Sequence, residues 1–327
     1  MARPILTAPH FQDEAAAFAF VEAALWPNGP FCPHCGEAER VRRLQGKSTR
    51  PGLFKCNSCG QQFTVRVGTI FESSHLPLHL WLQVIHLMCA SKKGVSTRQI
   101  QRMLNCSMKT AWHLTHRIRE IMQPLPGAGP LGGEGMTLEG DVTYVGRKPG
   151  TKVSAGAGHM NPVFALVERG GAARAVHMPN VRGESIHAVL EQHASRASNF
   201  HTDEAAVFTQ IGWNFATHET VNHSRDEYSK RSSYLDFAKR KRFPNVTTNS
   251  VEGYFSILKR GVYGVYQAVS EHHLDRYLHE FSFRYSHREA LGVDDAARAH
   301  VALCGARGRR LTYQTTRRTS RVSRRPS

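Results

Sequence analysis

The chain has 327 residues, of which 43 are lysine or arginine and 26 are aspartate or glutamate, giving a formal net charge of +17 at pH 7. This excess of positive charge makes a polyanion the expected partner. The sequence contains no run of 18 apolar residues, and its N-terminus lacks a basic region followed by an apolar core. We therefore expect a soluble protein that neither enters a membrane nor is secreted, and the length allows about two domains.

The first 70 residues predict a short helix followed by a zinc site. Residues 1–28 are expected to form an N-terminal helical segment, because Asp13–Leu25 has an amphipathic pattern that ends at a Trp-Pro-Asn-Gly turn. Two Cys-x-x-Cys pairs follow, separated by twenty residues, and short strands over Arg40–Leu44 and Gly52–Lys55 suit the segment between them. The pattern predicts a zinc ribbon over residues 29–70 with one structural Zn²⁺, bound by Cys32, Cys35, Cys56 and Cys59.

Four unrelated buried thiols are the alternative interpretation, but each Cys-x-x-Cys pair is followed by a glycine, as tight turns around a metal favour. Seven cysteines in a chain of this length do not suggest a disulfide scaffold. A reducing cytoplasm is therefore the expected compartment.

Residues 71–122 predict helices over Leu78–Ala90, Thr97–Leu104 and Met108–Met122. The last two are joined by a three-residue turn and resemble a helix-turn-helix, with Ser96 and Ser107 as N-caps.

If the final helix enters a major groove, the residues near its start would approach base edges and the later arginines would hold phosphates. The residues concerned are Lys109 and Thr110 at the start, then Arg117 and Arg119. The alternative is an ordinary helical hairpin that buries Ile100, Leu104, Trp112 and Ile118.

Residues 123–136 are rich in proline and glycine and predict a linker to a second domain, residues 137–290. Its pattern predicts a strand over Thr137–Val145, a hairpin of Pro162–Glu168 and Ala173–Met178, a helix over Glu184–Ala197, a short strand ending at Asp203 and a later helix. This order is that of an α/β, ribonuclease-H-like fold with a mixed sheet. Residues 291–327 form a C-terminal extension, whose last 22 residues carry eight arginines and no acid; we expect them to be disordered and to seek phosphates.

Three carboxylates of this domain are candidates for one site: Asp141 in a strand, Asp203 at a strand end and Glu252 on the later helix. As neighbours they would repel one another unless cations neutralise them. Mg²⁺ or Mn²⁺ suits oxygen ligands, and two such ions about 3.5–4 Å apart support phosphodiester hydrolysis and transfer. Lys259 lies seven residues after Glu252 and so shares its helix face, while Val251, Phe255 and Leu258 form a separate apolar stripe.

The chain resembles the DDE-type insertion-sequence transposases, in particular the zinc-ribbon-bearing IS1595 branch with its ISXO-type catalytic domain. The resemblance rests on GDVTYVGRK around Asp141, FHTDEAAVF around Asp203, HETVNHSRDEY at His218–Tyr228, and the long motif beginning TNSVEGYFSILKRG over Thr248–Arg288. It departs from the usual family pattern at Val142, Gly146-Arg147 and Thr247, all outside the three carboxylates.

This resemblance implies a catalytic triad of Asp141, Asp203 and Glu252 that binds two Mg²⁺ ions, with Lys259 holding the DNA end. His223 and Asn249 are the implied supporting groups around the triad. Lys241, within the basic run of residues 239–242, and Arg260 are further expected DNA contacts.

The resemblance also implies double-stranded DNA as the partner, both element ends and target, and a homodimer or higher oligomer on that DNA, in the bacterial cytoplasm with the nucleoid. Two alternatives stay open. One is a zinc-ribbon and helix-turn-helix regulator that has lost catalysis, and the other is a nuclease that cuts without joining.

Overall fold

The computed structural model describes residues 4–125, 127–212, 214–233, 235–236, 241–242 and 245–312. The chain divides into two compact units. The first comprises Met1–Gln83, Gln101–Ile121 and Ala306–Ser327, and the second Val84–Ile100 and Met122–Gly305. No helix in the described part of the chain is long and apolar enough to cross a membrane.

The first unit begins with two helices, α1 (Pro9–Gln12) and α2 (Glu14–Leu25). Asp13 caps α2, since its side chain accepts a hydrogen bond of 2.7 Å from the Ala16 amide. A small antiparallel sheet follows, in the order β1-β2-β3, with β1 at Val41–Arg43, β2 at Phe54–Cys56 and β3 at Gln62–Phe63. Its core is aromatic, because Trp26, Phe54 and Phe63 pack together beside buried Cys32 and Cys56.

Three helices follow in the positions that the sequence predicts: α3 (Leu78–Ala90), α4 (Thr97–Leu104) and α5 (Met108–Ile121). Ser96 and Ser107 accept hydrogen bonds of 3.2 and 3.1 Å from the Gln99 and Thr110 amides, so both predicted N-caps are confirmed.

The predicted helix-turn-helix region, residues 71–122, is divided between the two units. The physical reason lies at the end of α3, where Arg284 and Arg298 of the second unit donate to the carbonyls of Met88 and Cys89. The second unit thereby includes the last turns of α3.

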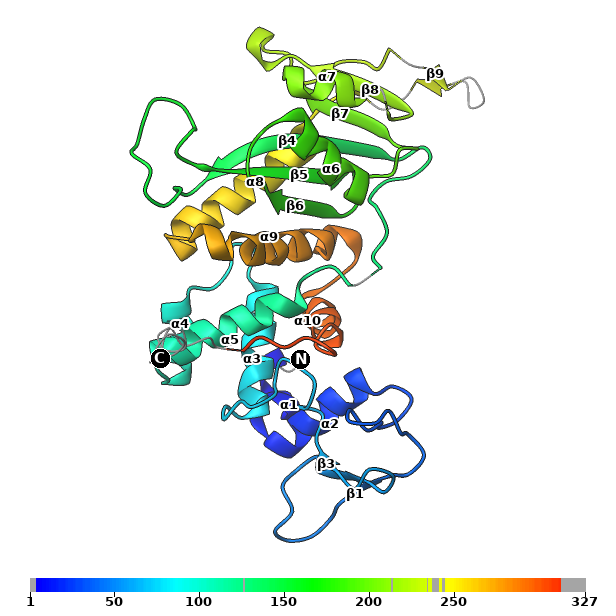
Figure 1. Ribbon diagram of the computed structural model, residues 1–327, viewed down its shortest axis with the longest axis vertical. Coiled ribbons are helices and arrows are strands. Elements are labelled where there is room, and N and C mark those ends of the chain that lie inside the picture. The colour runs from blue at the N-terminus through cyan, green and yellow to red at the C-terminus, as the bar shows by residue number, and fades with distance from the viewer. Residues whose placement is uncertain are drawn as a thin grey trace, which may run out of the picture. The chain divides into compact units, whose positions relative to one another are not determined.

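The second unit is built on a five-stranded mixed sheet in the order β6-β5-β4-β7-β8 (Figure 1). Its strands are β4 (Thr137–Val145), β5 (Asn161–Glu168), β6 (Ala173–His177), β7 (Asn199–Asp203) and β8 (Thr217–Val221). β5 is antiparallel to both β4 and β6, whereas β4, β7 and β8 run parallel. This is the ribonuclease-H-like arrangement that the sequence predicts.

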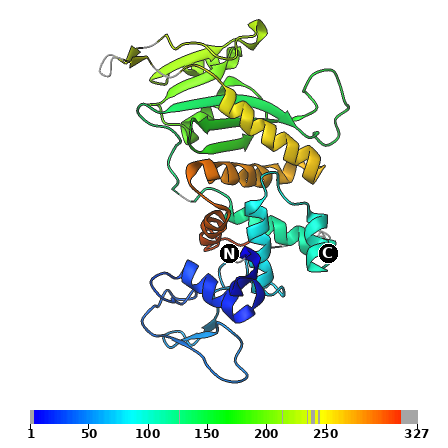
Figure 2. The same cartoon turned by 180° about the vertical axis from the view of Figure 1, so that it is seen from behind.

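Two hydrophobic clusters cover the two faces of this sheet. On one face, Val251, Phe255 and Leu258 of α8 (Asn249–Gly261) and several residues of α9 (Glu271–Ser286) pack on β4, β5 and β6. Figure 2 shows α8 lying across the sheet. The opposite face is covered by α6 (Gly183–His193) and α7 (Ala206–Gly212). The apolar stripe predicted for α8 is therefore its buried face.

The predicted helix Glu184–Ala197 ends earlier than expected, at His193. Ala194 is extended and forms a parallel bridge to Leu131, whose amide donates to the His193 carbonyl over 2.8 Å. Pairing with a distant segment therefore terminates the helix.

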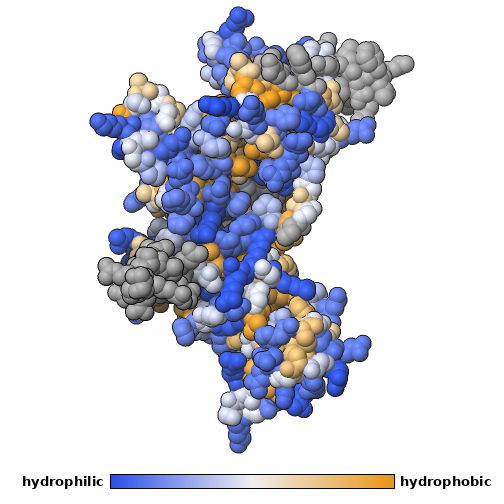
Figure 3. Space-filling view, in the orientation of Figure 1, coloured by the Kyte–Doolittle hydropathy of each residue, from blue (hydrophilic) through white to orange (hydrophobic). Residues whose placement is uncertain are grey.

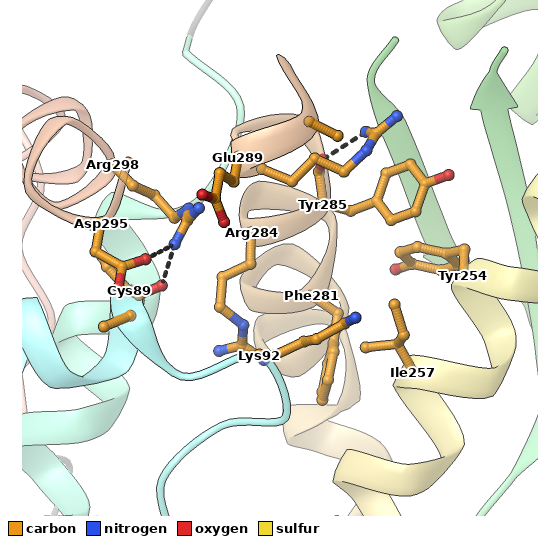
Figure 4. Close-up of a pocket in the computed structure, with 13 residues that line it drawn as sticks. Cys89, Lys92, Tyr254, Ile257, Phe281, Arg284, Tyr285, Glu289, Asp295 and Arg298 are labelled. Carbon is orange, nitrogen blue, oxygen red and sulfur yellow. Dashed lines mark hydrogen bonds and ion pairs between the residues drawn. The ribbon is translucent and has the colours of Figure 1, made fainter. Parts of the chain in front are cut away.

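The remaining elements are short or terminal. A π-helical turn at Val262–Tyr266 follows α8, and α10 (Asp295–Cys304) is capped by Asp294. Figure 4 shows Arg298 of α10 between the Cys89 carbonyl and Asp295. These residues line a cavity of about 420 Å³ together with residues of α8 and α9. The other described elements are β9 (Leu235–Asp236), β10 (Lys241–Arg242) and the 3₁₀ turns Ile5–Thr7, His223–Arg225 and Glu289–Leu291.

Candidate active site and metal centre

The four predicted cysteines form a compact ligand cluster in the first unit. Their sulfur atoms all lie within 4.8 Å of one another, with 3.6 Å between Cys32 and Cys59 and 3.7 Å between Cys35 and Cys56. Tetrahedral coordination with Zn–S bonds of about 2.3 Å requires sulfur separations of about 3.8 Å. The cluster therefore fits one Zn²⁺, and four sulfurs complete its coordination as in a structural site.

The two Cys-x-x-Cys segments have the same backbone turn. Gly36 and Gly60 donate their amides to the carbonyls of Cys32 and Cys56 over 2.9 and 3.0 Å, and both have a positive φ, of 79° and 73°. A glycine adopts this conformation without strain, which explains why one follows each pair.

Sheet register brings the two predicted aspartates side by side. In the parallel pair β4–β7, Thr137 lies opposite Asn199 and Glu139 opposite His201. The last pair is Glu139 with His201, and Asp141 and Asp203 each follow it by two residues. Adjacent strands lie about 4.8 Å apart, so the two carboxylates leave the same edge of the sheet as neighbours.

The electrostatics of Asp141 reflect this crowding. The pKa of Asp141 is raised to about 7, mainly by burial and also by the charges of Asp203 and Glu252. Lys259 and the Val142 amide act in the opposite direction. The pKa of Asp203 is also raised, mainly by burial. A site that raises the pKa of its aspartates is one where a divalent cation would stabilise the charged forms.

Glu252 is held at the start of α8 by two neighbours. One of its carboxylate oxygens accepts a hydrogen bond of 2.8 Å from the Thr248 hydroxyl and lies 3.3 Å from His223 Nε2. His223 also lowers the pKa of Asp203, so this imidazole lies within electrostatic reach of both carboxylates. Among the described residues, the cysteines form a group of side chains close enough together to hold a metal ion, and the three carboxylates do not form such a group.

The other predicted site residues on α8 are exposed. Lys259 lies two turns after Glu252 on the same helix face, and its positive charge lowers the pKa of Asp141. Asn249 is the first residue of the helix, and Arg260 follows Lys259. The side chain of Lys241 lies outside the described part of the structure.

The basic residues of α5 behave differently from one another. Lys109 and Thr110 are exposed near its start, where the sequence predicts contact with bases. Arg117 and Arg119 are 5% and 0% exposed, which disfavours the prediction that they hold phosphates. Arg117 donates 2.7 Å to the Glu72 carbonyl and lies over the Trp81 ring, and burial lowers its pKa to about 10. These two arginines support the fold of the first unit.

Sequence reasoning missed Glu139 as a functional residue. It is completely buried in β4, two residues before Asp141, and contacts Arg169 and the first turn of α8. The sequence signal for Glu139 is its position two residues before Asp141, on the same face of the strand. A charged residue at a buried strand position requires partners.

Comparison with known protein families matches most of the chain. Residues 130–286 match the ISXO2-like transposase domain, and residues 12–62 match the transposase zinc-ribbon domain. The chain belongs to the IS1595 family of insertion-sequence transposases. The zinc-ribbon match spans all four cysteines, and the ISXO2-like match spans Asp141, Asp203 and Glu252.

This chain is similar to a protein of Halobacterium salinarum described as an uncharacterized protein in transposable element ISH50. The two are 26% identical over 298 residues, which cover 84% of this chain and 91% of the relative. Two solved structures give much weaker matches. A simian T-cell lymphotropic virus intasome in complex with a PP2A regulatory subunit matches at 12% identity and TM-score 0.25, over 52% of this chain and 60% of that one. A pre-cleavage Mos1 transpososome matches at 14% identity and TM-score 0.19, over 60% and 73%.

Proposed function

We propose that this chain binds the terminal inverted repeats of a bacterial insertion sequence and catalyses Mg²⁺-dependent cleavage and strand transfer at them. The observation that carries the proposal is that Asp141, within β4, and Asp203, at the end of the adjacent strand β7, lie on the sheet across which the helix of Glu252 packs. Membership of a transposase family supports the same reaction.

In this proposal, Asp141, Asp203 and Glu252 bind the metal ions. The carboxylate oxygens are hard ligands, and the crowding that raises the pKa of Asp141 to about 7 is relieved when a divalent cation binds. Two Mg²⁺ or Mn²⁺ ions would activate the attacking oxygen and stabilise the leaving oxygen of the phosphodiester.

The other residues position the DNA and the triad. Lys259 is exposed and two turns from Glu252, so its ammonium extends the site towards a phosphate or base of the DNA end. His223 holds Glu252 before metal binds and would release it to the cation. Asn249 and Arg260 remain candidates for contacts beside the site.

The first unit is proposed to recognise the element ends. Lys109 and Thr110 at the exposed start of α5 would approach bases, and the zinc ribbon would hold the adjoining surface in place. Hydrophilic side chains dominate the visible face in Figure 3. The net charge of +17 suits binding to the phosphate backbone of DNA. Pairing two ends would require at least two protomers, and the expected setting is the bacterial cytoplasm.

Replacement of Asp141 tests this proposal. We expect Asp141→Asn to lower Mg²⁺-dependent end cleavage by at least about 10³-fold, because the bound cation supplies several kcal/mol of transition-state stabilisation and 1.36 kcal/mol is tenfold in rate. End binding in a gel-shift assay should persist. Glu191→Gln, an exposed acid on α6, is the matched control and should cleave normally.

Strand transfer with pre-cleaved ends separates the remaining alternatives. Joining of these ends to target DNA by the wild type, lost in Asp141→Asn, is the expected result. Cleavage without joining would indicate a nuclease, and specific binding without either reaction would indicate a regulator. Cleavage retained by Asp141→Asn would contradict the triad.

A further inference from the structure

Glu139 forms an unusually complete set of hydrogen bonds for a buried acid. Its Oε1 atom accepts from Arg169 Nε and Nη2 at 3.0 and 2.8 Å and from the Ser250 hydroxyl at 3.0 Å. Its Oε2 atom accepts from the amides of Ser250 and Val251 at 2.7 and 3.1 Å. The Glu139 carboxylate thus links β4 to Arg169, which directly follows β5, and to the first turn of α8.

These contacts replace the ordinary cap of α8. An N-cap side chain normally accepts from the second or third amide of its helix, and Thr248 occupies the N-cap position here. The Thr248 side chain makes no capping bond, because its hydroxyl donates to Glu252 instead. Glu139 accepts from those amides in its place, and its negative charge suits the positive end of the helix dipole.

Arg169 extends the same network to the chain that leads into α8. Its Nη1 atom donates to the Asn245 carbonyl over 2.8 Å, and Nη2 lies 3.2 Å from the Thr247 carbonyl and from His201 Nδ1. His201 is on β7, two residues before Asp203. Arg169 therefore contacts the strands of both aspartates and the segment before Glu252.

We propose that Glu139 and Arg169 are positioning residues that fix the third carboxylate, Glu252, relative to Asp141 and Asp203. The inference rests on the proposed function. Glu139 and Asp141 share a rigid strand and are two residues apart, so a bond from Glu139 to the Val251 amide ties the backbone next to Glu252 to the strand of Asp141. Arg169 restrains the same turn from its other side.

Stability alone is a poor explanation for this network. Replacing a buried ion pair by packed apolar groups is often neutral or stabilising, so such pairs are weak evidence of a stabilising role. Groups that orient metal ligands, in contrast, typically change metal affinity about 10- to 100-fold when they are replaced. The two roles predict different results for metal binding.

The test is a Mn²⁺ titration of the zinc-loaded, full-length protein, with free Mn²⁺ followed by electron paramagnetic resonance. We expect Glu139→Gln and Arg169→Lys to raise the Kd for Mn²⁺ about tenfold or more, since each keeps the side-chain size but breaks the network. Glu280→Gln is the matched control, because Glu280 is an equally buried acid that pairs with Arg284 on α9. It should bind Mn²⁺ as the wild type does. In end cleavage, excess Mn²⁺ should restore Glu139→Gln to nearly the wild-type rate.

Each outcome decides between the explanations. Wild-type Mn²⁺ affinity in Glu139→Gln, or an equal loss in Glu139→Gln and Glu280→Gln, would overturn the positioning role. Asp141→Asn serves as the reference for the site, and it should abolish the binding. If Asp141→Asn binds Mn²⁺ as the wild type does, the proposed metal site itself fails, which differs from failure of Glu139 alone. Thermal unfolding by circular dichroism verifies that each variant folds.

Discussion

The two candidate metal sites of this chain differ in how far the protein alone assembles them. The four cysteines lie within 4.8 Å of one another and their sulfur separations of 3.6 and 3.7 Å already match a tetrahedral zinc site. The three carboxylates do not form such a group, and Glu252 contacts Thr248 and His223 instead. The cysteines could bind an ion as they stand, whereas Glu252 would have to leave these partners.

The difference follows from chemistry. Uncharged thiols can approach one another without a metal, whereas neighbouring carboxylates repel, and Asp141 responds with a pKa of about 7. A structural ion stabilises a fold and needs no vacant position, but a catalytic ion must admit water and substrate.

Loss of zinc should have the largest effect. We expect Cys56→Ser to release the ion and unfold residues 29–70, because zinc binding contributes about 10–16 kcal/mol in comparable small domains. Zinc content by atomic absorption and limited proteolysis of this segment measure the effect. Cys106→Ser, outside the cluster, is the matched control. A Cys56→Ser protein with full zinc content would show that the four cysteines are not the site.

Acidic pH should weaken the carboxylate site next. With the pKa of Asp141 raised to about 7, a proton competes with the cation below that pH. The apparent Mn²⁺ affinity should fall about tenfold per pH unit below 7 and change little above it. Between about pH 4 and 7, Asp141 carries a proton in the metal-free folded protein but has lost it in the unfolded chain. Stability of the metal-free protein should therefore decrease as pH rises through this window.

Titrations of Mn²⁺ and thermal unfolding at several pH values measure both effects. Asp141→Asn should remove the pH dependence of unfolding that comes from this residue. An Mn²⁺ affinity that is constant from pH 8 to 6 would show that Asp141 is not a ligand.

Substitutions of the exposed Lys109 and the buried Arg117 on α5 should have smaller effects, which differ in kind. Lys109→Ala should weaken DNA binding modestly and reduce the salt slope by about one, as expected for loss of one phosphate contact. Arg117→Met should instead lower the stability of the first unit by about 1–3 kcal/mol, because the Glu72 carbonyl loses its donor. Salt-dependent gel shifts and denaturant unfolding distinguish them. A loss of DNA affinity in Arg117→Met without destabilisation would restore a role at phosphates.

Local patterns predicted the elements of the fold well. The spacing of apolar residues and the serine caps located α3, α4 and α5, and the glycine-rich turn located the β5–β6 hairpin. The helix α6 was predicted too long, because pairing between Ala194 and Leu131 ends it and such pairing is not visible in local sequence.

The site was predictable in its residue types but not in its geometry. Spacing and family motifs indicate the acids and cysteines, whereas the pairing of β4 with β7, which brings the strands of Asp141 and Asp203 together, is visible only in the structure. Charge patterning could not distinguish exposed Lys109 from buried Arg117 and Arg119, since both kinds of residue lie on one basic helix. The strand pattern places Glu139 on the side of Asp141 but assigns it no role, because its partners, Arg169 and Ser250, are distant in sequence.

Anomalous diffraction from crystals grown with zinc and Mn²⁺ tests most directly that the carboxylates form a metal site. Data collected on both sides of each absorption edge would distinguish the two elements. We predict zinc at the four cysteines and manganese bonded to Asp141 and Asp203, with Glu252 turned from His223 towards the ion. Manganese absent from Asp141 and Asp203, with Glu252 still on His223 at saturating Mn²⁺, would contradict the account.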